Sequence, residues 1–246
     1  QWLPHEPLIL VPGLMCDHAV WEPLLPALAA GRHCTVVDHS NASSLVTMAQ
    51  QLLDAAPARF ALAGHSMGAR VALEVVRLAP QRVSRVALLD TGYLPRAAGA
   101  AGEEEAAKRH ALLKVAQEQG VRAMAQVWVQ GMVHPARLGD AALVERILAM
   151  FSRKSAEVFA AQITALLTRP DASDVLRSLQ VPTLLGCGAQ DSWSPPAQHQ
   201  AMLQLLPPAA EGVINVVEEA GHMAPMERPE AVAAGMLRWL RAGVSV

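Results

Sequence analysis

One serine of this chain lies in a sequence pattern that can make its hydroxyl a nucleophile. The segment Gly64-His65-Ser66-Met67-Gly68 follows the apolar run 60–63 and precedes residues 69–79, where apolar side chains recur at helical spacing. Small residues two positions before and after Ser66 permit a sharp strand-to-helix turn without a Cβ collision. Such a turn would hold the hydroxyl where a base and a substrate can both reach it. A turn serine that only caps a helix is the alternative interpretation.

A serine nucleophile needs a base to take up its proton and an acid to orient that base. Asp191 lies in the turn-rich segment 186–195, and His222 lies in the segment 219–229. Each segment follows an apolar run, and residues beyond the carboxyl ends of neighbouring strands converge on one crevice in an open α/β sheet. We therefore expect Ser66, Asp191 and His222 to meet. Asp90, which follows another apolar run, is the competing acid, and Asp191 as a simple turn residue is the structural alternative.

The elements that must position these residues follow a βαβα order. Apolar runs bounded by Gly, Pro or Asp read as strands buried on both faces, which is typical of a parallel sheet covered by helices. Helical segments separate most of these runs, and the pattern predicts an α/β fold with a mostly parallel, doubly wound sheet of about six strands. The expected strands are 8–11, 34–37, 60–63, 83–89, 182–186 and 213–217, and the expected helices are 21–30, 45–56, 67–79, 198–206 and 229–241.

One interval departs from this rhythm. From about residue 95 to 178 there is no strand pattern, but several segments carry apolar residues three, four and seven apart, as helices with one apolar face do. A parallel crossover needs only about a dozen residues, so the interval indicates an inserted helical cap at 95–178 on a core made of 1–94 and 179–246. Its charged stretch 103–109 is expected to be a solvated helix start.

Composition narrows the classes of function. About half of the 246 residues are apolar and the formal net charge is −2, and there is no basic run with interleaved aromatics, so a nucleic-acid partner is not expected. Apolar stretches end well before about 18 residues, so no membrane span is expected either. The three scattered cysteines and an N-terminus without the pattern of a secretory signal favour a cytoplasmic protein. The nine histidines show no metal-ligand spacing, so we expect neither a metal nor a cofactor.

Taken together, the three loops resemble those of the α/β-hydrolase family, in its capped serine esterase and lactonase branch, over essentially the whole chain. The resemblance rests on the motif 64–68, on Gly188-Ala189-Gln190-Asp191 followed by Pro195, and on Gly221-His222 followed by Glu227-Arg228-Pro229. The chain order Ser, Asp, His also agrees. By this resemblance the backbone N–H groups of Leu14 and Met67 would bind the oxyanion, although this chain has Val11-Pro12-Gly13-Leu14 where many relatives carry His-Gly.

The resemblance implies a serine hydrolase that cleaves carboxylic esters or lactones. The apolar residues of the expected cap favour a small-molecule substrate with a hydrophobic acyl or alcohol part. Carbon–carbon bond hydrolases and cofactor-free perhydrolases keep the same three residues, and a ligand receptor on this fold is an alternative of another class. Haloalkane dehalogenases and epoxide hydrolases are disfavoured because they use a carboxylate where this chain has Ser66. The sequence leaves the oligomeric state open. Candidate pocket residues, for which core packing is the alternative, are Trp128, Met132, Met150, Trp193 and Met223.

Overall fold

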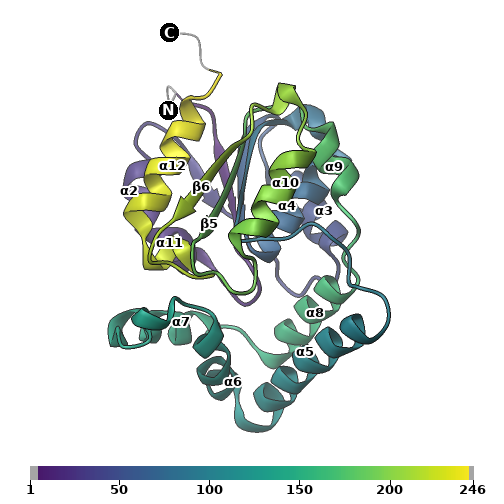
Figure 1. The fold of residues 1–246 in the computed structure, drawn as a ribbon, viewed down its shortest axis with the longest axis vertical. Coiled ribbons are helices and arrows are strands. Elements are labelled where there is room, and N and C mark those ends of the chain that lie inside the picture. The colour runs from purple at the N-terminus through teal and green to yellow at the C-terminus, as the bar shows by residue number, and fades with distance from the viewer. Residues whose placement is uncertain (1–4, 244–246) are drawn as a thin grey trace.

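The fold is built on one six-stranded sheet in which every neighbouring pair of strands is parallel (Figure 1). The computed structural model describes residues 5–243, so the first four residues, on which the expectation about a secretory signal partly rests, lie outside the described residues. The strand order β2-β1-β3-β4-β5-β6 confirms the predicted doubly wound sheet. The strands are β1 (Leu8–Val11), β2 (Cys34–Val36), β3 (Phe60–His65), β4 (Val83–Leu89), β5 (Thr183–Gly188) and β6 (Val213–Val217).

Helices cover both faces of this sheet (Figure 1). On one face lie α3 (Leu45–Ala55), α4 (Met67–Leu78), α9 (Ser173–Ser178) and α10 (Pro196–Leu205). On the other lie α1 (His18–Trp21), α2 (Leu25–Leu28), α11 (Ala224–Glu227) and α12 (Pro229–Arg241). None of the described helices combines the length and the apolar content that crossing a membrane requires.

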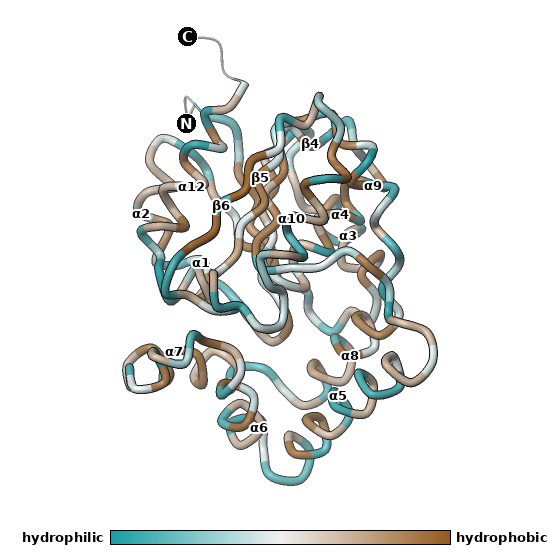
Figure 2. The backbone as a smooth tube through the Cα atoms, viewed as in Figure 1, coloured by the Kyte–Doolittle hydropathy of each residue, from teal (hydrophilic) through white to brown (hydrophobic). Residues whose placement is uncertain are grey.

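Burial explains the continuous apolar runs of the inner strands. Every residue of β1, β3, β4 and β5 is buried, whereas the outer strands β2 and β6 include exposed residues. A strand covered by helices on both faces must be apolar on both, so its sequence does not alternate. Figure 2 shows the resulting concentration of hydrophobic residues along the strands at the centre of the molecule.

The predicted helix at 21–30 is wrong as a single element. The chain instead forms α1, a 3₁₀ turn at Glu22–Leu24 and then α2. Pro23 and Pro26 lack the N–H groups that a continuous helix would use, which breaks the segment into short turns. The other 3₁₀ turns are Pro80–Arg82, Val129–Gly131, Pro135–Arg137 and Pro208–Ala210.

The chain between β4 and β5 is helical, and most of it lies together beyond one end of the sheet (Figure 1). Helix α9, which falls within the predicted cap interval, packs instead beside α4 and α10. The division of the chain into a core and a cap at residues 94 and 178 stays a prediction. The helices beyond the sheet are α5 (Ala100–Gln119), α6 (Val121–Trp128), α7 (Ala141–Ser152) and α8 (Ala156–Leu167).

The turn from β3 into α4 depends on two close backbone contacts. A Cβ at Gly64 would overlap the backbone of Gly68 and Ala69, and a Cβ at Gly68 would overlap the carbonyl oxygen of Val11 on β1. Because backbone atoms cannot move aside as a flexible side chain can, both positions exclude larger residues. These contacts seat the start of α4 directly against β1.

We expect Gly68→Ala to lower the free energy of unfolding by about 2 kcal/mol, since the added methyl group has no space to occupy. Gly139→Ala is the matched control, because an added Cβ there meets nothing within 4 Å; it should leave stability unchanged or raise it by under about 1 kcal/mol. Urea denaturation of both variants measures the difference as a shift in midpoint at constant slope. Equal midpoints for Gly68→Ala and the wild type would contradict the argument.

Candidate active site

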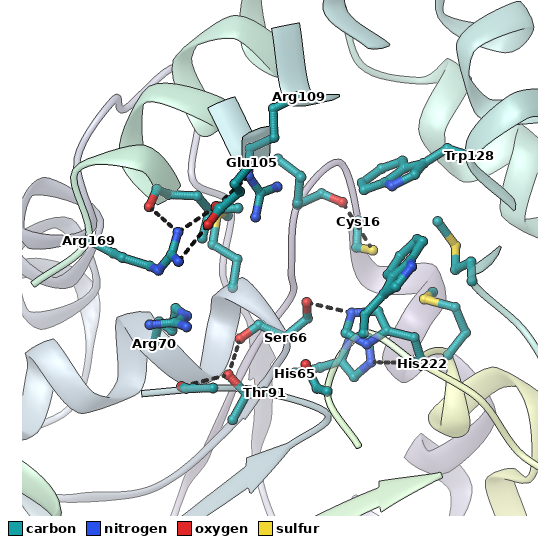
Figure 3. A pocket seen from close by; sticks show the side chains of 18 of the residues that line it. Cys16, His65, Ser66, Arg70, Thr91, Glu105, Arg109, Trp128, Arg169 and His222 are labelled. Carbon is teal, nitrogen blue, oxygen red and sulfur yellow. Dashed lines mark hydrogen bonds and ion pairs between the residues drawn. The ribbon is translucent and has the colours of Figure 1, made fainter. Parts of the chain in front are cut away.

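The structure brings the three predicted side chains into one hydrogen-bonded row, of which Figure 3 shows Ser66 and His222. Ser66 Oγ lies 2.8 Å from His222 Nε2, and His222 Nδ1 lies 2.9 Å from Asp191 Oδ2. Ser66 occupies the turn between β3 and α4 with φ 58° and ψ −121°, a backbone conformation that non-glycine residues rarely adopt. The strained turn therefore presents the hydroxyl to a base at hydrogen-bonding distance.

Asp191 is held as an ionised acceptor. Its Oδ1 accepts hydrogen bonds from the backbone N–H groups of Trp193 (3.0 Å) and Ser194 (2.9 Å), while Oδ2 faces the imidazole. Burial opposes ionisation, but His222 and the N–H donors outweigh it and hold the pKa of Asp191 below its ordinary value. The carboxylate therefore fixes the His222 ring with Nε2 directed at the serine.

Asp90, the competing acid, has a different place. It is fully buried after β4 and accepts a hydrogen bond from the Gly188 backbone N–H at 3.0 Å. Burial and the charge of nearby Asp191 raise the pKa of Asp90 well above its ordinary value, whereas the pKa of Asp191 is lowered. The geometry thus gives Asp191, and not Asp90, the position beside His222.

Two buried residues that the sequence analysis gave no catalytic role hold the His222 loop in place. His65 Nε2–H donates to the His222 carbonyl oxygen at 2.7 Å, and burial lowers the pKa of His65 to about 3, so its ring is neutral. The Glu227 carboxylate accepts from the N–H groups of Gly221 and Met223, each at 3.0 Å. The sequence analysis quoted Glu227 only as part of a motif. Its role as an acceptor requires the five residues between Gly221 and Glu227 to turn back on themselves, and sequence spacing alone does not predict that turn.

The helical segment beyond the sheet also contacts this loop directly. The His222 backbone N–H donates to the Met132 carbonyl oxygen at 2.8 Å, and the His134 N–H donates to Glu227 Oε1 at 2.7 Å. Arg137 Nε donates to the Glu219 carbonyl oxygen at 2.8 Å. The position of the histidine is therefore coupled to the backbone of residues 132–137.

The two N–H groups predicted to bind the oxyanion have no acceptor among residues 5–243. They belong to Leu14 and Met67, the predicted oxyanion donors, and both residues line the cavity. The neighbouring Met15 N–H is already bonded to Gln162 Oε1 at 2.7 Å, so it cannot serve. Gln162 is a fully buried α8 residue that no sequence pattern pointed to. The oxyanion role of Leu14 and Met67 stays a prediction, and their free N–H groups suit it.

A cavity of about 500 Å³ opens above Ser66, and one of its walls is apolar. Four of the five predicted pocket residues line this wall: Trp128, Met132, Trp193 and Met223. The Trp193 ring lies 5.0 Å from the His222 ring and stacks at 5.8 Å on Trp128. Met150 is fully buried and does not line the cavity, whereas its neighbour Phe151 does, because adjacent helical residues point in different directions.

Cys16 also lines the cavity but is not poised to react. Its Sγ lies 3.5 Å from the Leu14 carbonyl oxygen, and burial raises the pKa of the thiol to about 12. A thiol in this state is a poor nucleophile. Within the described part of the chain, no group of three or more His, Cys, Asp and Glu residues is arranged to hold a metal ion.

The opposite wall of the cavity is charged. Glu105 accepts from Arg169 through both Nη atoms, at 2.6 and 2.8 Å, and from Arg109 Nε at 3.0 Å. The expectation of a solvated helix start is therefore wrong for Glu105, although Glu103 and Glu104 are exposed. Sequence spacing cannot reveal the Arg169 contact, because the two residues are 64 positions apart and meet only through the packing of α5 against α8.

Residues 8–235 match the family model described as the alpha/beta hydrolase family. The chain belongs to the alpha/beta hydrolase family. The chain is 32% identical over 253 residues to the dihydrolipoyllysine-residue acetyltransferase component of an acetoin cleaving system from Pseudomonas putida. That alignment covers 96% of this chain and 63% of the relative, so the chain spans less than two thirds of that protein.

In two further comparisons the alignment covers nearly the whole length of both proteins. A proposed non-heme bromoperoxidase of Mycobacterium tuberculosis, BpoC, is 29% identical, with 95% of this chain and 93% of the relative aligned. The solved structure of a thermophilic esterase from Thermogutta terrifontis superposes with a TM-score of 0.82 at 25% identity, covering 96% of this chain and 89% of that one. These similarities support a hydrolase and leave its ester specificity to be argued.

The arginine contacts of Glu105 predict a pH-dependent contribution to stability. Burial opposes ionisation, but Arg169 and Arg109 lower the pKa of Glu105 from 4.5 to about 2. Because the pKa of Glu105 is lower in the folded protein than in the unfolded chain, its ionisation stabilises the fold at pH values above about 4.5. This stabilisation is lost as the pH falls from about 4.5 through about 2. Glu105→Gln should therefore melt below the wild type at pH 6, and the gap should narrow toward pH 3.

Glu103→Gln is the control for this measurement, because Glu103 is exposed on the same helical turn. Its thermal midpoint should follow that of the wild type at both pH values. A gap between Glu105→Gln and the wild type that is the same at pH 6 and pH 3 would contradict the ion-pair account.

Proposed function

We propose that this chain is a serine hydrolase that cleaves carboxylic esters or lactones through an acyl-enzyme. The observation that carries the proposal is the 2.8 Å contact between Ser66 Oγ and His222 Nε2, continued by the 2.9 Å contact from His222 Nδ1 to Asp191. A ligand receptor has no need of an aligned base and acid behind a strained serine, so this geometry favours catalysis over binding alone.

In the proposed reaction, Ser66 Oγ attacks the substrate carbonyl carbon while His222 Nε2 takes the hydroxyl proton. The Leu14 and Met67 N–H groups bind the oxyanion that forms, and Asp191 stabilises the imidazolium. His222 then gives its proton to the departing alcohol oxygen, which leaves an acyl group on Ser66. A water molecule next gives a proton to His222 and attacks the acyl carbon. The acid is released as the serine recovers its proton.

The apolar wall supports a substrate with a hydrophobic portion. Trp128, Phe151 and Trp193 present aromatic surface beside the serine, and such rings bury alkyl or aryl groups efficiently. The similarity to the Thermogutta terrifontis esterase supports ester cleavage as the reaction class.

Perhydrolysis is a second candidate, favoured by the similarity to BpoC. In that reaction hydrogen peroxide takes the place of water at the acyl-enzyme, so the product is a peroxy acid and the same Ser66–His222 geometry serves. No metal or redox change is required, because the peroxide oxygen acts as the nucleophile.

Replacing the nucleophile tests the central proposal. A fluorophosphonate should label the wild type at neutral pH and leave Ser66→Ala unlabelled, and kcat on p-nitrophenyl esters should fall at least about 10⁴-fold in the variant. The thermal midpoint of Ser66→Ala should stay close to that of the wild type, because the side chain lies on a turn at the cavity. An unlabelled wild-type protein would favour the receptor alternative.

A substrate comparison separates the reactions that share these three residues. We expect turnover of p-nitrophenyl acyl esters to exceed that of a vinylogous diketone, because the proposed reaction forms an acyl group on Ser66 that water then hydrolyses. Assaying peroxy acid formation with added hydrogen peroxide measures the second candidate in the same samples. Rapid turnover of the diketone alone would overturn the esterase proposal.

A further inference from the structure

The cavity above Ser66 carries positive charge in a chain whose formal net charge is −2. Its lining includes four basic residues, Arg70, Lys108, Arg109 and Arg169, and one acidic residue, Glu105, an excess of three positive charges. A cleft lined by charge of one sign concentrates ligands of the other sign.

The one carboxylate in this lining is already used. Glu105 accepts from both Nη atoms of Arg169 and from Arg109 Nε, and Lys108 is paired with Glu104 at 3.0 Å outside the cavity. These contacts leave Arg70 without an acidic partner: in the part of the chain that the structure describes, no carboxylate oxygen lies within 4 Å of its guanidinium.

Arg70 is nonetheless held firmly. Its Nη1 donates to the Leu94 carbonyl oxygen at 2.9 Å, and its Nη2 lies against Gly92, where an added Cβ would come within 2.7 Å. Arg70 is half-buried and lines the cavity. Burial and the neighbouring Arg169 lower its pKa to about 9, so the group remains a cation at neutral pH. A cation at the cavity surface that has no carboxylate partner is available to an anionic ligand.

The place of Arg70 relates this charge to the reacting centre. Arg70 lies on the first turn of α4, four residues after Ser66, and both residues line the same cavity. Figure 3 shows Arg70 and Arg169 on one side of Ser66, with His222 and Trp128 on the other. A substrate carbonyl at Ser66 would therefore have an apolar wall on one side and an unpaired guanidinium on the other.

We propose that Arg70 recognises a carboxylate on the substrate, so that the preferred substrate is an ester or lactone bearing an anionic carboxylate a few bonds from the carbonyl that Ser66 attacks. This inference rests on the proposed hydrolase function and names its substrate class. The planar guanidinium fork matches a carboxylate. The nearby charge of Glu105 favours a monoanion over a phosphate dianion.

Monomethyl glutarate and dimethyl glutarate make a matched pair of probes, because they differ only in whether the far end is a carboxylate or a neutral ester. We expect wild-type kcat/KM to favour the monoester by at least about 10-fold, and Arg70→Gln to lose about 10- to 100-fold on the monoester, as expected for a lost charged hydrogen bond. Activity of Arg70→Gln on the diester should change by less than about threefold, since the diester carries no charge for Arg70 to contact.

Arg122→Gln is the charge-matched control, because Arg122 is an exposed arginine that pairs with Glu145 and does not line the cavity. It should hydrolyse both probes as the wild type does. Arg70→Lys keeps the charge and loses the fork, so it should fall between the wild type and Arg70→Gln on the monoester alone. If Arg70→Gln does not fold, Arg70→Lys carries the test: an equal loss on both probes overturns the proposal.

Binding to Ser66→Ala separates this proposal from the proposed reaction. Calorimetry should detect monomethyl glutarate binding to Ser66→Ala and a loss of at least about 10-fold in affinity when Arg70→Gln is added. If that loss is seen but the wild type hydrolyses neither probe, the carboxylate site stands and the hydrolase proposal fails. If the wild type hydrolyses both probes equally and Arg70→Gln affects them alike, the carboxylate site is overturned. Stronger competition against monomethyl glutarate binding by inorganic phosphate than by butyrate, a monoanionic carboxylate, would overturn the choice of a carboxylate.

Discussion

The site depends on one steric constraint, the close approach of the start of α4 to β1. Gly64 and Gly68 allow the backbone to turn so sharply that Ser66 takes a positive φ, and a side chain at either glycine would overlap backbone atoms. The same turn determines three directions at once: that of the Ser66 hydroxyl, that of the free Met67 N–H, and that of the Arg70 side chain one helical turn later. A small shift of α4 would move all three groups relative to the cavity.

The order of the strands places the other groups around that turn. Strand β1 lies between β2 and β3, so the chain order reverses there and the loops after β1 and β3 adjoin at the edge where ligands bind in open α/β sheets. The histidine comes from the loop after β6, and buried polar contacts rather than neighbouring strands bring it close. His65 and Glu227 bind its backbone from the core, and the Met132 carbonyl binds it from the helical insertion. A change in the position of the insertion would therefore alter the base as well as the pocket.

The cavity has two chemically distinct walls, and each follows from a different part of the fold. Helices α6 and α7 supply Trp128 and Phe151 to the apolar wall, while α4, α5 and α8 frame the charged one. Glu105 is hydrogen-bonded to two arginines of this wall, and the remaining guanidinium of Arg70 has only a backbone partner. Positive charge beside an aromatic surface is suited to a ligand that is itself amphipathic.

Local patterns in the sequence were sufficient to predict the parallel sheet and to select Ser66, Asp191 and His222, because a buried strand and a polar turn each depend on residues close together in the chain. Details that depend on single residues within a helix were harder to predict from the sequence. Prolines divided the expected helix at 21–30, and Phe151 lines the cavity where Met150 was expected. The sequence thus determined which residues are candidates for the chemistry and which strands they follow. Only the tertiary structure decided that Asp191 rather than Asp90 faces the imidazole, that Glu105 pairs with Arg169, and that Arg70 is left without a carboxylate. These outcomes depend on contacts between residues tens of positions apart, which packing creates and local spacing does not encode.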